Sequence, residues 1–162
     1  MSDTNPNNLT AFDQHDHTKC VSGALEKAEN ACLRRNVKFT STRRRVLEIL
    51  LESHTAMGAY EILERLSAEG LGSKPPVAYR ALKFLIAQGF VHKIERLNAF
   101  VACSNPDHDH APAFMICRSC NRVAEASTMI DTGFAPLAKD NGFVIEQTVI
   151  EAQGLCPDCI ER

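Results

Sequence analysis

The pattern of apolar and polar residues predicts four helices in the N-terminal half of the chain. Apolar side chains recur at helical spacing over residues 21–36, 58–69 and 77–88, and a fourth stripe, over 46–51, follows the capping hydroxyls of residues 40–42. The last helix follows a turn and carries basic side chains among its apolar ones. This order is typical of a helix-turn-helix whose last helix enters the major groove of DNA.

Two short segments after the last helix predict a β-hairpin, the wing of a winged helix. Residues 90–96 and 99–103 flank Leu97 and Asn98, and Asn can adopt the positive φ that a tight hairpin loop requires. If these two residues form the loop, His92 lies directly opposite Cys103. Facing residues have Cβ atoms about 5 Å apart, close enough to share one metal ion.

Beyond the wing, the pattern predicts a second, smaller unit with about three strands and one helix. Strands are expected over 113–116, 122–126 and 143–151, and the helix over 128–141. The whole chain is therefore expected to be α+β, with a winged helix-turn-helix domain and a small C-terminal α/β domain. The expected divisions are a disordered tail at 1–18, a DNA-binding domain at 19–103, a hinge at 104–112 and a second domain at 113–162.

Two cysteine pairs frame the second domain, Cys117-Arg-Ser-Cys120 and Cys156-Pro-Asp-Cys159. Each pair places two thiolates on one tight turn, and two facing turns complete a tetrahedral four-cysteine zinc site. Two disulfides are the alternative, but they need an oxidising compartment, and a redox site uses one pair rather than two. The sequence has no signal peptide pattern and no apolar run near the roughly 20 residues that span a bilayer. We therefore expect a cytoplasmic protein without a membrane segment.

Charge is distributed unevenly along the chain. Residues 1–31 carry two Lys and five Asp or Glu, residues 32–96 carry twelve Lys or Arg and six Glu, and residues 97–162 carry four basic and nine acidic residues. The basic middle favours binding to nucleic acid, because neutralising phosphates releases condensed counterions. Three arginines open the second helix, where they oppose the helix dipole unless an anion such as a phosphate lies nearby. The candidate DNA contacts from these two helices are Arg43, Arg44, Tyr79, Arg80 and Lys83.

A second group of metal-ligating residues surrounds the expected hinge. It comprises His92, Cys103, His108, His110 and Glu125. A mixed site of His, Cys and carboxylate ligands can close tetrahedrally around zinc. Because its ligands would come from the wing, the linker and the second domain, such a site would bind metal only in one relative orientation of the domains. The pattern therefore predicts a metal sensor.

Four runs of residues resemble the Fur family of bacterial metalloregulators, and most closely its zinc-responsive members. The similarity covers residues 25–160, and its specific runs are 35–40, 75–82, 88–93 and 149–156. It implies a homodimer with winged-helix DNA-binding domains and a C-terminal dimerisation domain. It also implies two zinc ions per chain, one structural at the four paired cysteines and one regulatory at His92, Cys103, His110 and Glu125. Tyr60 falls at a family DNA-contact position, beside Tyr79 and Arg80 of the recognition helix.

The function that this resemblance implies is a zinc-responsive transcriptional repressor that binds a palindromic DNA operator and controls zinc uptake genes. An iron- or peroxide-sensing regulator is the alternative, because the His-Asp-His run at 108–110 is similar to that of such relatives. Cys103 favours zinc, since thiolate prefers it to harder ions. A zinc hydrolase or deaminase is disfavoured, because His-x-Glu, His-Glu-x-x-His, Gly-x-Ser-x-Gly and a phosphate-binding glycine loop are all absent from the sequence. We expect no enzyme and no small-molecule ligand other than the metal ion.

Overall fold

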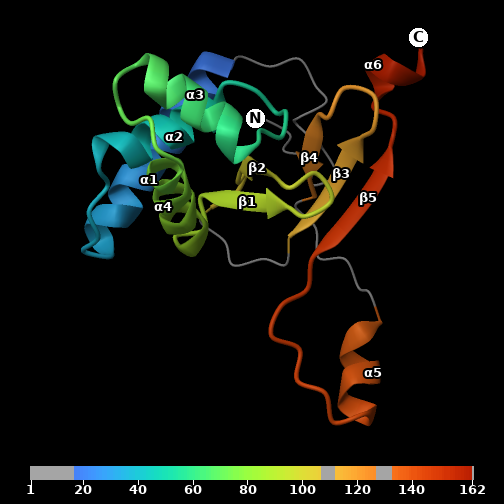
Figure 1. Ribbon diagram of the computed structural model, residues 1–162. Helices are drawn as coiled ribbons and strands as arrows, with labels where there is room; N and C mark the ends of the chain where they lie inside the picture. The colour runs from blue at the N-terminus through green and yellow to red at the C-terminus, as the bar shows by residue number, and fades with distance from the viewer. Residues whose placement is uncertain (1–16, 107–111, 127–132, 162) are drawn as a thin grey trace, which may run out of the picture.

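The computed structural model describes residues 17–106, 112–126 and 133–161, and it has the expected α+β architecture (Figure 1). Four helices and a hairpin precede a separate three-stranded sheet with two short helices. The elements are α1 (His17–Arg34), α2 (Ser41–Leu51), α3 (Ala59–Ala68), α4 (Pro75–Ala87), β1 (Val91–Ile94), β2 (Ala99–Ala102), β3 (Ala113–Cys117), β4 (Val123–Glu125), α5 (Phe134–Asp140), β5 (Ile150–Gly154) and α6 (Pro157–Ile160).

The four predicted helices of the N-terminal half are confirmed, and their apolar stripes form one helical core. α2 begins where the Thr40 hydroxyl accepts a hydrogen bond from the Arg43 amide at 3.3 Å. α4 begins at Pro75, two residues earlier than expected, because a proline has no amide hydrogen to leave unsatisfied in the first turn. α1 already includes residues 17 and 18, so the expected tail is too long at its C-terminal end, and residues 1–16 lie outside the described part.

The wing is confirmed, but its predicted register is wrong. β1 and β2 pair antiparallel with His92 opposite Val101, not Cys103. The loop has four residues, 95–98, closed by a 3.2 Å hydrogen bond from the Asn98 amide to the Glu95 carbonyl, and Asn98 has the expected positive φ of 46°. The longer loop shifts the pairing by two residues. Since side chains alternate with a period of two, His92 and Cys103 still lie on the same face.

The C-terminal sheet consists of β4, β3 and β5 in that order, with β3 antiparallel to β4 and parallel to β5. The expected strand at 143–151 is largely wrong, because β5 occupies residues 150–154. Its pairing with β3 begins at Ile150 opposite Ala113, the first residue of β3, so no described strand lies beside residues 143–149. The expected helix at 128–141 is confirmed from Phe134, after Gly133 at φ 68°, while residues 128–132 lie outside the described part.

The wing and the loop after α2 pack directly against the C-terminal sheet. Ile94 of β1 has no exposed surface and lies in a core with Phe114 and Ile116 of β3. The loop over residues 53–57 forms one isolated bridge to β2, at Phe100, and another to residue 122, next to β4. This loop therefore links the two sheets by backbone hydrogen bonds, in addition to the apolar packing between them. Among the described helices, none combines the length and apolar character needed to cross a bilayer.

Candidate metal centres

The four paired cysteines converge into one cluster at the end of the C-terminal sheet. The sulfur atoms of four cysteines all lie within 4.8 Å of one another: Cys117, Cys120, Cys156 and Cys159. The sulfurs of Cys120 and Cys156 are 3.8 Å apart, which is too long for a disulfide bond. Four thiols held at this spacing match the ligand set of a structural zinc ion.

Local backbone structure explains why the two pairs face each other. Cys117 ends the central strand β3, and the turn after it closes with a 2.9 Å hydrogen bond from the Asn121 amide to the Cys117 carbonyl. Cys156 caps the short helix α6, whose first turn carries Cys159. A 2.8 Å ion pair between Arg122 and Asp158 joins the two turns. The parallel pairing of β3 and β5 therefore brings residues almost forty positions apart to one end of the sheet.

Hydrogen bonding and burial shift the pKa values of two of these cysteines in opposite directions. The amides of Cys156 and Cys120 lower the pKa of Cys117 to about 6, because they donate hydrogen bonds that stabilise the thiolate. Burial raises the pKa of Cys156 to about 12, since its thiolate would be desolvated next to the other sulfurs. Four adjacent thiolates need a positive ion between them, and the residues present therefore fit zinc.

A second cluster lies between the wing and the C-terminal sheet. His92 of β1, Cys103 after β2 and Glu125 of β4 each offer one ligand atom, all within 4.8 Å of one another. The His92 Nε2 and Glu125 Oε1 atoms are 3.1 Å apart, and the Cys103 Sγ lies 3.7 Å from the same oxygen. We call this cluster the hinge site. It brings together three of the four residues that the sequence predicts for the regulatory metal.

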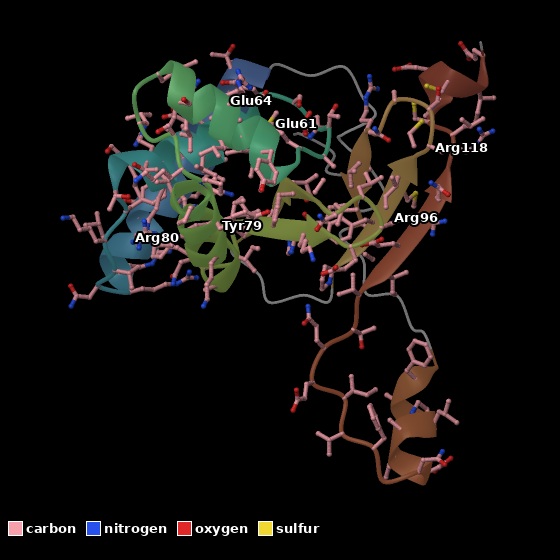
Figure 2. The ribbon with its side chains drawn as sticks, viewed as in Figure 1. Glu61, Glu64, Tyr79, Arg80, Arg96 and Arg118 are labelled. Atoms are coloured by element: carbon pink, nitrogen blue, oxygen red, sulfur yellow. The ribbon has the colours of Figure 1, made fainter. Side chains whose placement is uncertain are left out.

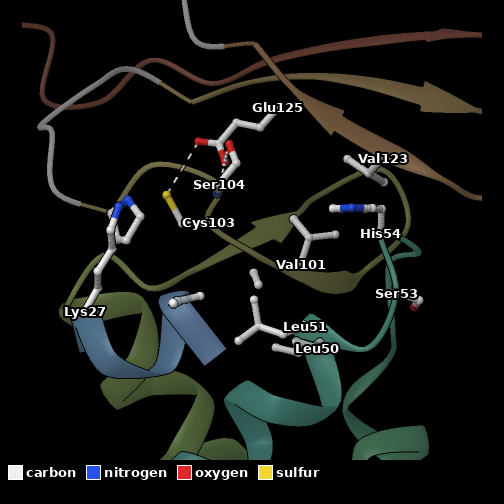
Figure 3. Close-up of a pocket in the computed structure, with 14 residues that line it drawn as sticks. Lys27, Leu50, Leu51, Ser53, His54, Val101, Cys103, Ser104, Val123 and Glu125 are labelled. Carbon is white, nitrogen blue, oxygen red and sulfur yellow. Dashed lines mark hydrogen bonds between the residues drawn. The ribbon is translucent and has the colours of Figure 1, made fainter. Parts of the chain in front are cut away.

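The hinge site is positioned by residues on both sides of the interface. The His92 ring packs edge-on against Phe114 of β3, with ring centroids 5.3 Å apart. The amide and hydroxyl of Ser104 donate hydrogen bonds of 2.8 and 2.9 Å to one oxygen of Glu125, leaving its other oxygen towards Cys103 (Figure 3). Ser104 was not among the site residues predicted from the sequence. Its position beside a predicted ligand is the only sequence signal, and no motif marks it.

The hinge site opens onto a cavity of about 260 Å³ lined by residues of α1, the loop after α2 and the wing (Figure 3). The side chains of His92 and Glu125 are 16% and 5% exposed, so the ligand atoms are largely shielded from water. Nitrogen, sulfur and oxygen donors at this spacing fit a tetrahedral zinc ion with one position left for a further ligand. The predicted fourth ligand, His110, and its alternative, His108, lie outside the described residues.

Four of the candidate DNA contacts lie on the helices α3 and α4. Tyr79 and Arg80 of α4 are exposed, and the Arg80 Nε donates a 3.2 Å hydrogen bond to the carbonyl of Pro76 (Figure 2). Lys83, one turn further along α4, is exposed, and Tyr60 of α3 is 65% exposed. These four side chains are free of the protein core and can reach a ligand in solvent. Their contact with DNA stays a prediction.

The arginines that open α2 have anions nearby, but these belong to the protein. Arg44 forms ion pairs with Glu29 and Glu48. Arg45 makes two hydrogen bonds of 2.7 and 2.8 Å to the carboxylate of Glu69, which lowers the pKa of that carboxyl. The guanidinium of Arg43 stacks over the ring of Phe84 at 3.7 Å. The unfavourable helix-dipole placement is therefore offset within the helical core, and DNA contacts by Arg43 and Arg44 stay predictions.

An apolar surface surrounds α5 and the segment that follows it. Phe134 and Leu137 of α5 are 54% and 59% exposed, and Phe143 and Val144 are 68% and 80% exposed. Figure 1 shows α5 standing away from the helical core and the wing. Exposed apolar patches of this kind mark interaction sites or ligand-binding grooves.

The fold and the two clusters define a class: winged-helix proteins that carry metal-ligating sites in and beside a C-terminal sheet. Within that class, a family model for the Ferric uptake regulator family matches residues 34–153, and the chain belongs to this family. The family membership inferred from the sequence is thereby confirmed.

The chain is similar to three proteins that are named as zinc regulators. It is 40% identical over 139 residues to the zinc uptake regulation protein of Escherichia coli K12, covering 85% of this chain and 81% of that protein. A solved zinc uptake regulator complexed with zinc and DNA is 39% identical and superposes with a TM-score of 0.80, covering 87% and 95% of the two chains. The holo form of XcZur is 34% identical, with a TM-score of 0.75 and coverage of 86% and 99%. Its apo form is 36% identical, with a TM-score of 0.50 and coverage of 88% and 99%.

Proposed function

We propose that this protein is a zinc-responsive transcriptional repressor that binds palindromic operator DNA as a homodimer and controls zinc uptake genes. The observation that carries the proposal is the hinge site, whose ligand atoms come from the wing on one side and the C-terminal sheet on the other. Such a site links metal occupancy to the position of a DNA-binding element. A repressor of this kind acts in the cytoplasm, and no enzymatic activity is proposed for either cluster.

The mechanism follows from the short connection between the hinge site and the recognition helix. His92 lies in β1, and the residue before β1, Phe90, donates a 2.9 Å amide hydrogen bond to the Leu85 carbonyl of α4. The Cys103 amide in turn donates a 2.8 Å hydrogen bond to Phe90. Fixing His92 and Cys103 against Glu125 therefore fixes the orientation of α4 relative to the C-terminal sheet.

We call the arrangement closed when the wing lies against the C-terminal sheet. A bound zinc ion would join the wing to this sheet, and it would favour the closed arrangement because only that arrangement brings the three ligands together. Driving such a two-state equilibrium from 1:99 to 99:1 takes about 5.5 kcal/mol of differential binding. This chain also superposes better on the holo than on the apo form of XcZur, although the two differ little in sequence identity. The arrangement of this chain is therefore nearer to that of the holo form of XcZur.

We assign two zinc ions to each chain. One is structural and held by the cysteine cluster, where four protein ligands leave no open position. The other is regulatory and held by His92, Cys103 and Glu125, with His110 proposed as the fourth ligand. The domain organisation that accompanies this assignment is a DNA-binding domain at 19–103, a hinge at 104–112 and a dimerisation domain at 113–162.

The apolar surface of α5 supports the homodimer. Phe134, Leu137 and Phe143 line a hollow together with Ile145 and Val149, and a second copy of this surface would cover them. In a dimer, two copies of α4 would reach successive major-groove faces of a palindromic operator, with Arg80 at a guanine edge.

Arg80→Ala is expected to weaken operator binding by about 1–3 kcal/mol, roughly 5- to 150-fold, because it removes the proposed bidentate contact to a base edge. Arg118→Ala is the matched control, since it removes the same charge from an exposed residue of the cysteine turn, far from α4 (Figure 2). Fluorescence anisotropy with a labelled operator measures both affinities. Equal affinities for the two variants would remove Arg80 from the recognition surface.

The function is tested by titrating wild-type protein with zinc, ferrous iron and manganese in separate experiments. We expect operator binding to appear at a lower free concentration of zinc than of either other ion, because Cys103 supplies a thiolate ligand. Sedimentation should give the free protein twice the chain mass of 17.9 kDa. A stronger response to iron would make the protein an iron or peroxide sensor, and binding without any metal dependence would refute the proposed function.

A further inference from the structure

A carboxylate of the C-terminal sheet is hydrogen-bonded to the turn of the wing, away from the hinge site. Both oxygens of Glu151, in β5, accept hydrogen bonds from the wing turn, one from the Glu95 amide at 2.6 Å and one from the Arg96 amide at 3.0 Å. The contact joins residues 55 and 56 positions apart. Two successive amides that share one ionised carboxylate form a charge-assisted, two-point contact, stronger than a neutral hydrogen bond.

The sheet register explains why Glu151 points at the wing. Glu151 pairs with Phe114 in the parallel ladder between β3 and β5, so the two side chains lie on the same face of the sheet. Phe114 is buried in the core that contains Ile94, the last residue of β1. The carboxylate therefore meets the wing where β1 ends and the turn begins, and Figure 2 shows Arg96 at this tip beside the C-terminal sheet.

Strand β1 is consequently held to the C-terminal sheet at two points by two carboxylates. Near its start, His92 lies 3.1 Å from Glu125, which is a candidate metal ligand. Just past its end, the amides of residues 95 and 96 are bound by Glu151, which belongs to neither metal-ligating cluster. The first contact uses atoms that are candidate metal ligands, whereas the second uses none.

We propose that Glu151 is a positioning residue that holds the wing closed without metal and thereby sets the free zinc concentration at which the hinge site fills. The proposal rests on the proposed function, in which closure assembles the hinge site. A ligand that needs the closed state binds with an apparent Kd equal to its intrinsic Kd divided by the closed fraction. Each contact that stabilises the closed state without metal therefore tightens apparent zinc binding, even though it touches no ligand.

Glu151→Gln tests this proposal with almost no change in size. The neutral amide keeps one oxygen to accept a hydrogen bond and turns an NH₂ donor towards the second amide, so the two-point contact is lost. We expect the apparent Kd of the hinge site for zinc to rise by roughly tenfold, because hydrogen bonds to charged groups are the stronger ones. The cysteine cluster should keep its zinc, and operator affinity at saturating zinc should stay within about threefold of wild type, because excess metal restores closure.

Two controls separate the carboxylate contact from charge and side-chain effects in the same turn. Glu95→Gln removes a carboxylate that pairs with Lys93 at 2.8 Å, but it keeps the backbone amide that Glu151 binds, so zinc affinity should not change. Arg96→Pro removes one of the two amides, while Arg96→Ala keeps it. Only the proline variant should weaken zinc binding, and its effect should not add fully to that of Glu151→Gln, since both remove the same contact.

The measurement is a competition titration of the labile zinc against a chelating dye, carried out without DNA. Amide hydrogen exchange of the zinc-bound proteins supplies a second readout: residues 95 and 96 should be protected in wild type and exchange faster in Glu151→Gln. Unchanged zinc affinity in Glu151→Gln would overturn the proposal, as would an operator affinity that stays equally reduced at saturating zinc. Because the dye titration needs no operator, it tests Glu151 even if the wild-type protein proves not to be a zinc-dependent repressor.

Discussion

Cys156→Ser is expected to remove the structural zinc and unfold the C-terminal part of the chain. Cys156 is only 2% exposed and supplies one of the four clustered sulfurs, so a hydroxyl there replaces a strong zinc ligand with a poor one. Structural zinc supplies about 10–16 kcal/mol in small domains. That exceeds or matches the total stability of about 5–15 kcal/mol for a typical domain. The segment between β4 and β5 adds little buried apolar surface to this part of the chain, because α5 and residues 143–147 are largely exposed.

Zinc content and thermal unfolding check this expectation. Wild-type protein should hold a tightly bound zinc ion that survives mild chelation, and Cys156→Ser should lack it and show no cooperative unfolding of the C-terminal sheet. Cys103→Ser is the matched control, because it makes the same chemical change at the hinge site and should keep the chelation-resistant zinc. If Cys156→Ser retained that zinc and the wild-type melting temperature, the cysteine cluster would have no structural role.

Cys103→Ser is expected to abolish the zinc response of operator binding. Cys103 supplies the only sulfur of the hinge site, and serine replaces a strong zinc ligand with a poor one at a position that is 5% exposed. Loss of residues that merely orient metal ligands costs about 10–100-fold in metal affinity, and loss of a ligand should cost at least as much. We therefore expect at least about a hundredfold more free zinc to be needed for operator binding.

Operator binding as a function of buffered free zinc measures this effect. Cys32→Ala is the control. Cys32 is similarly buried, but it packs in the helical core, where burial raises the pKa of its thiol. It belongs to neither metal-ligating cluster of the described residues. It should keep the wild-type zinc response. Zinc-dependent operator binding that is unchanged in Cys103→Ser would show that the sensing site lies elsewhere.

The hinge site shows which structural features a local sequence pattern can predict. The predicted hairpin placed His92 directly opposite Cys103, close enough to share a metal ion, and the two residues do lie in one cluster. The pairing of the two residues was wrong by two positions, because the loop length depends on four residues whose hydrogen bonding the pattern does not specify. Since a shift of two preserves the face, the error in register left the predicted cluster intact.

The ion pairs of α2 show what a local sequence pattern cannot predict. The arginines at its start correctly indicated nearby anions, but the sequence could not distinguish a DNA phosphate from Glu29 or Glu69. Glu29 lies in α1 and Glu69 follows α3, so their approach to α2 depends on how the helices pack. Strand β5 was misplaced for a related reason, because its bounds depend on the strand that lies beside it.

The sequence by itself determined the helices of the N-terminal half, the four-cysteine ligand set, three residues of the hinge site and the family. These properties depend on spacing along the chain, which fixes the face of each side chain and the ligands on each turn. Only the tertiary structure decided the register of the wing, the hydrogen bond of Ser104 to Glu125 and the hydrogen bonds of the wing turn to Glu151. The contacts of Ser104 with Glu125 and of Glu151 with the wing turn join residues that are 20 or more positions apart, and the packing of separate elements, not any local pattern, brings such residues together.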